Sequence, residues 1–290
     1  MADHKRVSVI VPVWNNARQL LRCIAALQAQ DYPQHLYEIV VVDNASTDDT
    51  AARARETGVR VLEQPKPGSY AARNLAIART SSDFLAFTDS DCVPDSGWLS
   101  TAMARAERED ALGVVAGRIV LFDEDGASGG WARSYEALVA FPQHQASEGT
   151  CATANWLSPR DAIVAAGGFD ETVKSGGDHH MGIRLRDAGL RLVYEPDMVV
   201  RHPTRATFGA LLAKRRRLTG GHWDRMAGRM RLPRAMARNL LETGRRGKKI
   251  LVARDAPISE RLKAEAILVA LGVADVGEYV RLSLGGSTVR

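Results

Sequence analysis

The chain has 290 residues, 45% of them hydrophobic and 25% charged, with a formal net charge of +5, so it can bury a full core as one large domain or as a domain with an extension. Its longest uncharged C-terminal run, Ala266–Ala274, is far shorter than the roughly 20 apolar residues that cross a bilayer, so no membrane-spanning segment is expected. Three widely spaced cysteines, Cys23, Cys92 and Cys151, indicate neither a disulfide framework nor a zinc knuckle, and they fit a reducing cytoplasm.

The first third of the chain alternates short apolar runs with segments of helical spacing. Met1–Arg6 lacks the apolar stretch of a secretory signal and leads directly into the first apolar run. The predicted strands are Val7–Val13, Glu38–Val42, Val59–Glu63 and Asp83–Thr88. The predicted helices are Asn16–Gln30, Asp48–Glu56 with Ser46 or Thr47 as its cap, and Tyr70–Arg79. Strands that alternate with helices predict an α/β fold with a mostly parallel central sheet flanked by helices.

The carboxyl ends of these predicted strands carry acidic residues. Asp43 follows the second strand, and Asp89 follows the fourth. Because ligands of open α/β sheets bind outside the carboxyl ends of the strands, both carboxylates should face one crevice. Pro12 and Val13, at the end of the first strand, should line the same crevice.

The middle of the chain continues the pattern less regularly. Strands are predicted at Val114–Phe122 and Val193–Val200, and helices at Trp131–Ala140, at Asp161–Ala166 before Gly167 and Gly168, and at His180–Ala188 before Gly189. Between them, the acidic and glycine-rich stretch Asp123–Gly130 is predicted to be a flexible loop and a candidate lid.

The pattern changes beyond Pro203, and we expect a domain of residues 1–205 followed by a basic, mostly helical extension of residues 206–290. Helical tracts are predicted at Phe208–Leu218 and at Ile258–Leu284, the second broken by Gly272. Arg201–Asp255 contains 16 Lys and Arg against 3 Asp and Glu. This stretch can be a solvated helical face, a surface for an anionic membrane or a site for a phosphate-bearing acceptor. We hypothesise that the two tracts pack on the first domain and present Lys and Arg to anionic lipid, at the inner face of the plasma membrane.

Two carboxylates flank one residue in the segment FTDSD, directly after a predicted buried strand. Asp89 and Asp91 can supply the oxygen ligands that Mg²⁺ or Mn²⁺ prefers while leaving positions open for substrate phosphates. A D-x-D triplet alone is common in solvated turns, and its place at the end of a strand is what favours a metal site. Asp43 can likewise be a turn residue or an acceptor for a nucleobase N–H.

Six segments in a fixed order resemble the family 2 glycosyltransferases of the GT-A fold. They are VSVIVPVWN, VVVDNASTDDT, GSYAARNLAI, FTDSDCVPD, NWLSPRDAIVAAGGFD and GGDHHMGIRLRDAGLRLVYEP, within about residues 5–203. The resemblance implies a GT-A nucleotide-binding domain and a metal-dependent, inverting transfer of a sugar from a nucleoside-diphosphate sugar to a hydroxyl of a saccharide or lipid-linked acceptor. UDP is the expected nucleotide because Asp43 suits the imide N–H of uracil, although thymine and guanine offer the same donor.

The resemblance also implies roles for individual residues. The donor nucleotide is expected against Pro12, Val13, Trp14, Asp43, Arg73, Asp89 and Ser90. The expected ligands of Mg²⁺ or Mn²⁺ are Asp89, Asp91 and His202, and Asp178 is the expected general base. Asn155 and Trp156 are expected on the acceptor side, where the indole ring stacks on a sugar face unless it belongs to the core.

The chain departs from the family pattern in two places. The acidic pair that the family carries before one helix is here Gly177–Asp178, so the first acid is missing, and the acidic position two residues after Asp178 is His180. Asp178 can also be a plain helix cap. Arg215–Trp223 resembles the Q-x-x-R-W motif of processive synthases only superficially, so a single addition per encounter is expected.

Other functions fit the residues less well. The missing first acid keeps open a non-catalytic GT-A-like module that docks on a membrane or a protein. A sugar nucleotidyltransferase would carry a glycine- and Lys/Arg-rich phosphate loop near the N-terminus, which this chain lacks. A dinucleotide-dependent oxidoreductase would need a glycine-rich turn where the chain has Pro12–Asn16. Nucleic acid is not an expected partner, because few aromatic residues interleave the basic stretch.

Overall fold

The computed structural model describes residues 5–124, 130–205, 207–226, 228 and 230–288. The chain divides into two compact units. Unit 1 comprises Met1–Val120, Phe141–Glu171 and Gly177–His202, and unit 2 comprises Leu121–Ala140, Thr172–Gly176 and Pro203–Arg290. The long C-terminal segment of unit 2 therefore begins two residues before the boundary expected at residue 205. Unit 2 also contains Leu121–Ala140 and Thr172–Gly176, which had been expected in the first domain. Most of the predicted lid at 123–130 lies outside the described residues.

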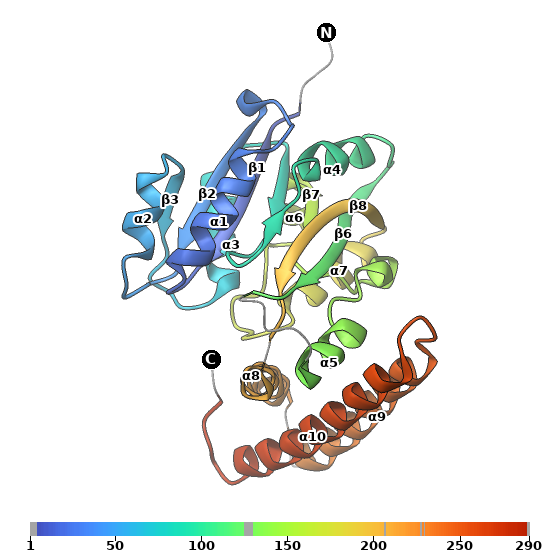
Figure 1. Cartoon of the computed structure of the whole chain (residues 1–290). Helices are drawn as coiled ribbons and strands as arrows, with labels where there is room; N and C mark the ends of the chain where they lie inside the picture. Colours follow the sequence, from blue (N-terminus) through green and yellow to red (C-terminus); the bar gives the residue numbers. More distant parts are fainter. Residues whose placement is uncertain (1–4, 125–129, 206, 227, 229, 289–290) are drawn as a thin grey trace. The chain divides into compact units, whose positions relative to one another are not determined.

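One eight-stranded sheet flanked by helices forms the core of unit 1 (Figure 1). The strands are β1 Val7–Val13, β2 Tyr37–Asp43, β3 Arg60–Glu63, β4 Phe84–Phe87, β5 Val93–Pro94, β6 Leu112–Phe122, β7 Trp156–Pro159 and β8 Arg191–Pro203, in the spatial order β3-β2-β1-β4-β7-β6-β8-β5. The helices of unit 1 are α1 Ala17–Gln28, α2 Thr50–Glu56, α3 Ser69–Arg79, α4 Trp98–Ala106, α6 Arg160–Ala165 and α7 Gly177–Asp187, with short 3₁₀ turns at Gln34–Leu36 and Gln143–Glu148. The predicted α/β class is confirmed.

The sheet is parallel in one half and antiparallel in the other. β1 pairs in parallel with β2 and β4, and β2 pairs in parallel with β3. β7 runs antiparallel to both β4 and β6, and β5 runs antiparallel to β8. The expectation of a mostly parallel sheet therefore holds for β1 to β4, which are connected in turn by α1, α2 and α3. The second half of the sheet contains antiparallel pairs, and the short strand β7 lies between the two halves.

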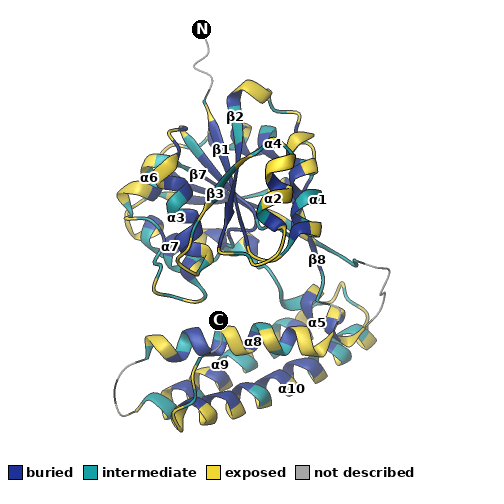
Figure 2. Cartoon of the chain, turned by 90° about the vertical axis from the view of Figure 1, so that its left-hand side faces the viewer, coloured by how far each residue is buried: buried dark blue, intermediate teal, exposed yellow. Residues whose placement is uncertain are grey.

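The central strands are buried on both sides, as Figure 2 shows for unit 1. Every residue of β1 is buried, which explains its continuous apolar run, since a strand covered on both faces has no solvent-facing positions. Helix α1 packs on this sheet through Leu20, Cys23, Ile24 and Leu27, the residues that recur at helical spacing. Trp98 and Leu99 of α4 complete the same core.

Three details of the predicted elements differ from the structure. Helix α2 begins at Thr50, and neither Ser46 nor Thr47 caps it, because the Ser46 hydroxyl instead accepts from the backbone N–H of Asn15 at 2.9 Å. Helix α10, Ile258–Ser283, is continuous through Gly272, so the predicted break there was wrong. Gly272 packs against helix α9, Arg231–Val252, where an added β-carbon would lie 3.3 Å from the Thr243 hydroxyl. Strands β5 and β7 and helix α4 had not been predicted.

Unit 2 is a helical bundle. Its helices are α5 Trp131–Val139, α8 Phe208–Arg225, α9 Arg231–Val252 and α10 Ile258–Ser283. Their core contains Tyr135, Leu211, Ile250, Leu268 and Leu271, one or more from each helix. A buried ion pair joins Arg215 of α8 to Asp275 of α10, and Thr219 donates to the same carboxylate at 2.9 Å. Among the described residues, no helix combines the length and the apolar composition needed to cross a lipid bilayer.

Candidate active site

The loops that follow β1 and β2 are tied together at the carboxyl edge of the sheet. The backbone N–H of Asn15 donates to the Ser46 hydroxyl, and the Asn15 side-chain oxygen accepts from the N–H of Thr47 at 2.8 Å. Asn15 adopts a positive φ of 46°, a conformation that asparagine tolerates better than most residues. These bonds hold the ends of the two strands, and the residues that follow them, in one fixed arrangement.

Asp43 lies at this edge with an unsatisfied carboxylate oxygen. Its side chain is buried, and Oδ2 accepts from the backbone N–H of Ser46 at 3.1 Å. Oδ1 is buried and has no hydrogen-bond partner among the described residues. A buried carboxylate oxygen without a donor costs free energy, so this atom is suited to receive an N–H from a ligand. Val13 is the register partner of Asp43, and the next residue, Trp14, is 63% exposed and available to a ligand.

Arg73 connects helix α3 to the segment after β4. Its guanidinium is buried, donates to Asp89 Oδ1 at 2.6 Å and lies 5.7 Å from the centre of the Tyr70 ring. The Asp89 carboxylate remains partly exposed. Asp89 is therefore held by a charge-assisted hydrogen bond on one oxygen while it still faces solvent.

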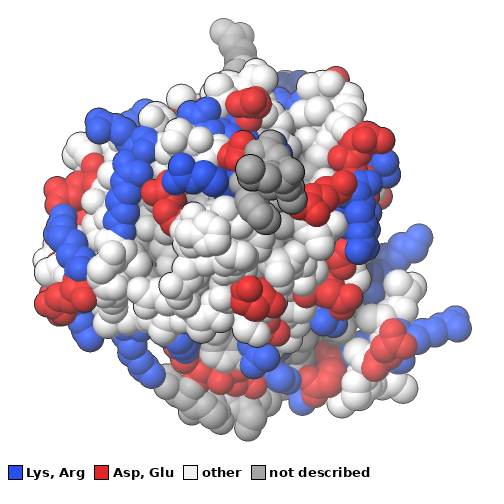
Figure 3. Space-filling view, turned by 90° about the horizontal axis from the view of Figure 1, so that it is seen from above, with Lys and Arg blue, Asp and Glu red and all other residues white. Residues whose placement is uncertain are grey.

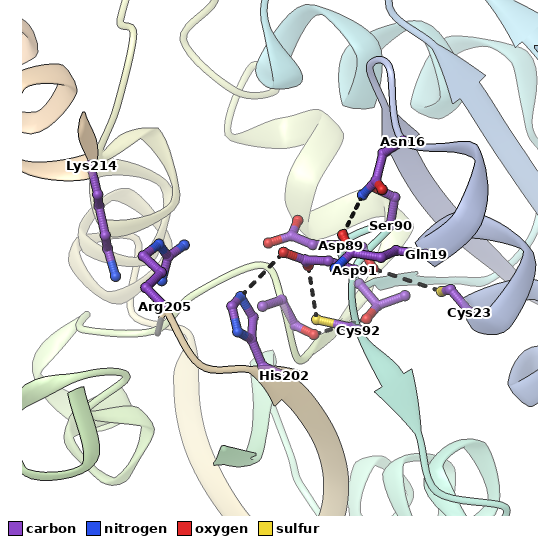
Figure 4. A network of polar contacts seen from close by, with 12 residues as sticks. Asn16, Gln19, Cys23, Asp89, Ser90, Asp91, Cys92, His202, Arg205 and Lys214 are labelled. Carbon is purple, nitrogen blue, oxygen red and sulfur yellow. Dashed lines mark hydrogen bonds and ion pairs between the residues drawn. The ribbon is translucent and has the colours of Figure 1, made fainter. Parts of the chain in front are cut away.

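Asp91 and His202 come together from segments more than a hundred residues apart. Asp91 Oδ2 lies 3.6 Å from His202 Nε2, as the close-up in Figure 4 shows. The thiol of Cys92 lies 3.7 Å from Asp91 Oδ1, and possible ligand atoms of these three residues all lie within 4.8 Å of one another. His202 is buried at the end of β8, with its ring 4.7 Å from that of Phe141. In the same view the Asn16 amide reaches the Ser90 hydroxyl at 3.5 Å.

The donor atoms around Asp91 fit a hard or borderline divalent cation. Carboxylate oxygen and imidazole nitrogen both bind Mn²⁺, and a carboxylate also suits Mg²⁺. Burial, and then the charges of Asp91 and Asp89, raise the pKa of the Cys92 thiol well above its ordinary value. A sulfur ligand suits softer metals, so the Cys92 side chain is the least suitable of the three for Mg²⁺ or Mn²⁺. Asp91 and His202 fit the metal, whereas the Asp89 carboxylate lies outside this group and is paired with Arg73.

Asp178 lies in the first turn of α7, where two donors surround one of its oxygens. Oδ1 accepts from the backbone N–H of His179 at 3.0 Å, and the Tyr70 hydroxyl lies 3.5 Å away. Burial raises the pKa of Asp178, while the His179 N–H and the nearby Arg73 charge oppose that shift. A carboxylate with a raised pKa is a better proton acceptor than an ordinary aspartate, so the environment suits a general base.

Tyr70 links the two sides of this site. It contacts Asp178 through its hydroxyl and Arg73 through its ring, and Arg73 in turn binds Asp89. Neither Tyr70 nor Cys92 was predicted as a site residue from the sequence. A signal for Tyr70 was present, because residues three apart on a helix share a face, and Tyr70 precedes Arg73 by three. Cys92 adjoins Asp91 in sequence, but nothing in the pattern indicated that its thiol points to the carboxylate.

The expected acceptor contacts at Asn155 and Trp156 were wrong. Both side chains are completely buried. The Asn155 amide donates to the carbonyls of Met198 and Arg118, both at 2.9 Å, and its oxygen accepts from the Trp98 indole at 2.8 Å. The Trp156 indole donates to the Ser158 hydroxyl at 2.6 Å. These groups stabilise the junction of β6, β7 and β8, and their hydrogen-bonding capacity is used inside the core.

Known proteins resemble this chain in sequence. Residues 8–156 match the model of the family described as glycosyl transferase family 2. The chain is 33% identical over 223 residues to the glycosyltransferase AglE of Haloferax volcanii, a match that covers 74% of this chain and 72% of AglE. It is 34% identical over 229 residues to a pre-mycofactocin glycosyltransferase of Mycobacterium tuberculosis, covering 73% of this chain but only 46% of that protein.

Solved structures resemble it in fold. A mannosyltransferase from Pyrobaculum calidifontis, PcManGT, determined in complex with GDP-Man and Mn²⁺, superposes with a TM-score of 0.65 at 20% identity, covering 95% of this chain and 88% of PcManGT. Residues 1–349 of S. aureus TarS, determined in complex with UDP, superpose with a TM-score of 0.57 at 15% identity, covering 97% and 92% of the two chains. Both likenesses show that the fold is shared.

Proposed function

We propose a reaction for this chain from the premise that it belongs to glycosyl transferase family 2 and is a glycosyltransferase. The reaction is a metal-dependent, inverting transfer of one sugar from a nucleoside-diphosphate sugar, with UDP as the first candidate nucleotide, to a hydroxyl of a saccharide or lipid-linked acceptor. One sugar is transferred per encounter.

The observation that supports this proposal best is the polar network from Asp178 to Asp89. Asp178 stands some ninety residues after Asp89 in the sequence, yet Tyr70 and Arg73 connect the two carboxylates in space. A transferase needs a proton acceptor beside the groups that hold the donor. This network provides that arrangement.

The donor nucleotide would lie along the ends of β1 and β2. The unpartnered Oδ1 of Asp43 would accept the imide N–H of the base, beside Pro12 and Val13, and the exposed indole of Trp14 would cover the ligand. Uracil and guanine both offer the imide N–H. The two structural neighbours contain UDP in one case and GDP-Man in the other, so they support a diphosphate donor without separating the two bases.

The diphosphate would lie between the segment after β4 and helix α3. Asp91 and His202 would hold Mg²⁺ or Mn²⁺, and the Mn²⁺ in PcManGT supports this choice of metal. When bound, the ion would offset negative charge on the diphosphate leaving group. Arg73 would position Asp89, and Ser90 would lie within reach of the same ligand.

The chemical step requires one proton acceptor. The acceptor oxygen attacks the anomeric carbon from the face opposite the leaving group, so a new C–O bond forms as the bond from that carbon to the β-phosphate oxygen breaks. Asp178 takes the hydroxyl proton during this attack, which contributes about 10²- to 10⁴-fold to the rate. The electron pair of the broken bond leaves with the nucleoside diphosphate. Because a single displacement takes place, the anomeric configuration is inverted.

Titration calorimetry with UDP, dTDP and GDP, each with Mn²⁺ or with EDTA, tests the donor site. We expect one nucleotide to bind with Mn²⁺, and we expect binding to weaken strongly in EDTA and in the Asp91→Ala variant. Hydrolysis of the matching nucleotide sugar, with Asp178→Asn as the control for chemistry, then tests the enzyme. If none of the three nucleotides binds under any condition, the inferred site is wrong and a non-catalytic module becomes the better account.

A further inference from the structure

Helix α10 carries a continuous apolar face that is exposed to solvent. Its members are Ile258, Leu262, Val269, Val273, Val276 and Val280, all of them exposed. At about 100° per residue they fall within a sector of roughly 60° along the whole helix, and no charged residue of α10 lies within this sector. Val273 is 68% exposed and Leu262 is 64% exposed. Single exposed apolar residues are ordinary, but a contiguous apolar patch marks an interaction surface.

The other sides of α10 are already used within the bundle. Leu268 and Leu271 face the core that α5 and α8 share, and Asp275 pairs with Arg215 of α8. Gly272 faces α9, where its carbonyl accepts from the Asn239 amide at 3.0 Å. Val273, one residue further around the helix from Gly272, is therefore turned away from the core.

Helix α9 extends this face. Asn239 points to α10, and Arg238, one residue before it, points to α8, since its guanidinium lies 3.2 Å from the His222 ring. Leu240 lies about 100° around the helix on the opposite side, so it is turned away from α8, and it is 76% exposed. The exposed faces of α9 and α10 thus lie on the same side of the bundle, and Figure 2 shows exposed residues recurring along both helices. We call this combined surface the outer face.

Basic side chains border the outer face. Lys248 of α9, about 80° around the helix from Leu240, and Arg254 just after the helix are both exposed. The one acidic residue of α9, Glu242, pairs with arginines of its own helix. On the part of the surface seen in Figure 3, by contrast, basic and acidic side chains are interspersed. The outer face therefore combines apolar side chains with an excess of positive charge, whereas the surface seen in Figure 3 carries charges of both signs.

We infer that the outer face of α9 and α10 binds the surface of an anionic lipid bilayer. A bilayer offers acyl chains to the apolar residues and negative head groups to the bordering cations, whereas a second copy of this chain would oppose like charges. In contrast to the hypothesis drawn from the sequence, this proposal assigns the lipid contact to apolar side chains of α10 and α9, with the cations supplied by α9 and the residues just after it.

Flotation of the full chain with lipid vesicles tests this inference. Vesicles of phosphatidylcholine alone are compared with vesicles of phosphatidylcholine and phosphatidylglycerol, at low and at high salt. We expect the protein to float with the anionic vesicles at low salt, and to float much less with neutral vesicles or at high salt. Failure to float with anionic vesicles, or equal flotation with both kinds, would overturn the inference.

Variants separate the two components of the surface. Val269→Glu with Val273→Glu should abolish flotation, and Lys248→Gln with Arg254→Gln should weaken binding at least tenfold. Two controls are made in unit 1. Val164→Glu places a negative charge at an exposed valine of α6, and Arg53→Gln with Arg108→Gln removes two exposed positive charges. Neither control should change flotation. Circular dichroism melts show whether each variant is folded. If no variant changes flotation, the face is wrong. If the chain instead forms a dimer that Val273→Glu separates, a second copy is the occupant.

Discussion

The phenol ring of Tyr70 occupies the space into which a side chain at position 177 would project. A β-carbon added to Gly177 would lie 2.8 Å from two carbons of that ring, closer than real contacts allow. The backbone N–H of Gly177 also donates to the Tyr70 hydroxyl at 2.8 Å. Position 177 therefore accommodates glycine but no larger side chain while Tyr70 keeps this position.

Gly177→Ala should displace Tyr70 and with it one contact of Asp178. We expect a lower melting temperature and a lower kcat, because an added methyl group in a filled site typically costs about 1–3 kcal/mol. Combining Gly177→Ala with Tyr70→Leu should restore part of the lost stability, since the clash is removed. The melting temperatures of the two single variants and the double variant measure this coupling. Strict additivity would contradict the contact.

Tyr70→Phe removes the hydroxyl that lies near Asp178 and that accepts from the backbone N–H of Gly177. Because a donor to a carboxylate favours its charged form, its loss should raise the pKa of Asp178 further and move the acid limb of the kcat profile to higher pH. KM for the donor should remain close to that of the wild type. Tyr32→Phe is the matched control, since that hydroxyl donates to the backbone of Lys5 instead. An unshifted acid limb in Tyr70→Phe would exclude the positioning role.

Asp178→Asn should abolish proton transfer and lower kcat by about 10²- to 10⁴-fold. The same change should raise the melting temperature at neutral pH. Burial raises the pKa of Asp178 in the folded chain above its unfolded value, so ionisation destabilises the fold once the pH exceeds the folded pKa, and this cost disappears below the unfolded pKa. Melting curves of both proteins across this pH range should therefore converge in acid. A variant that is less stable at neutral pH would contradict the assignment.

Asp91→Ala and His202→Ala should each weaken Mn²⁺-dependent nucleotide binding at least tenfold. The reason is that each removes one of the two donors that fit the cation. Cys92→Ala should leave the metal affinity unchanged, because sulfur is a poorly matched ligand for Mn²⁺ beside a carboxylate and an imidazole. Calorimetric titration of Mn²⁺ in the presence of the nucleotide measures all three. Should Cys92→Ala weaken the metal as much as His202→Ala, sulfur would have to be counted as a ligand.

Asp43→Asn should change which base is bound. The variant replaces a carboxylate that can only accept hydrogen bonds by an amide, and a lost hydrogen bond to a charged group costs about 1.5–3 kcal/mol, or roughly 10- to 100-fold in affinity for UDP or GDP. CDP has no imide N–H and should not lose affinity. Dissociation constants for UDP, GDP and CDP decide the matter, with Asp48→Asn as the control in the adjacent loop. Equal losses for all three would show that Asp43 does not contact the base.

Much of unit 1 was determined by local sequence. The continuous apolar run at Val7–Val13 predicts a strand buried on both faces, and the spacing of Leu20, Ile24 and Leu27 predicts the helix that covers it. Such signals work because strand and helix periodicities repeat within about ten residues. The placement of Asp43 and Asp89 after parallel strands follows from the same reasoning, since parallel strands end at one edge.

Only the tertiary structure decided which distant residues meet. The approach of His202 to Asp91, the ring of Tyr70 against Gly177 and the burial of Asn155 all depend on the order in which β7, β6 and β8 join the sheet. That order is set by packing between segments that can be more than a hundred residues apart, and the short strand β7 carries too few residues for a period to appear. A side chain's exposure depends on the neighbours it acquires in the folded chain, which is why Trp156 was expected on the acceptor side and is found in the core.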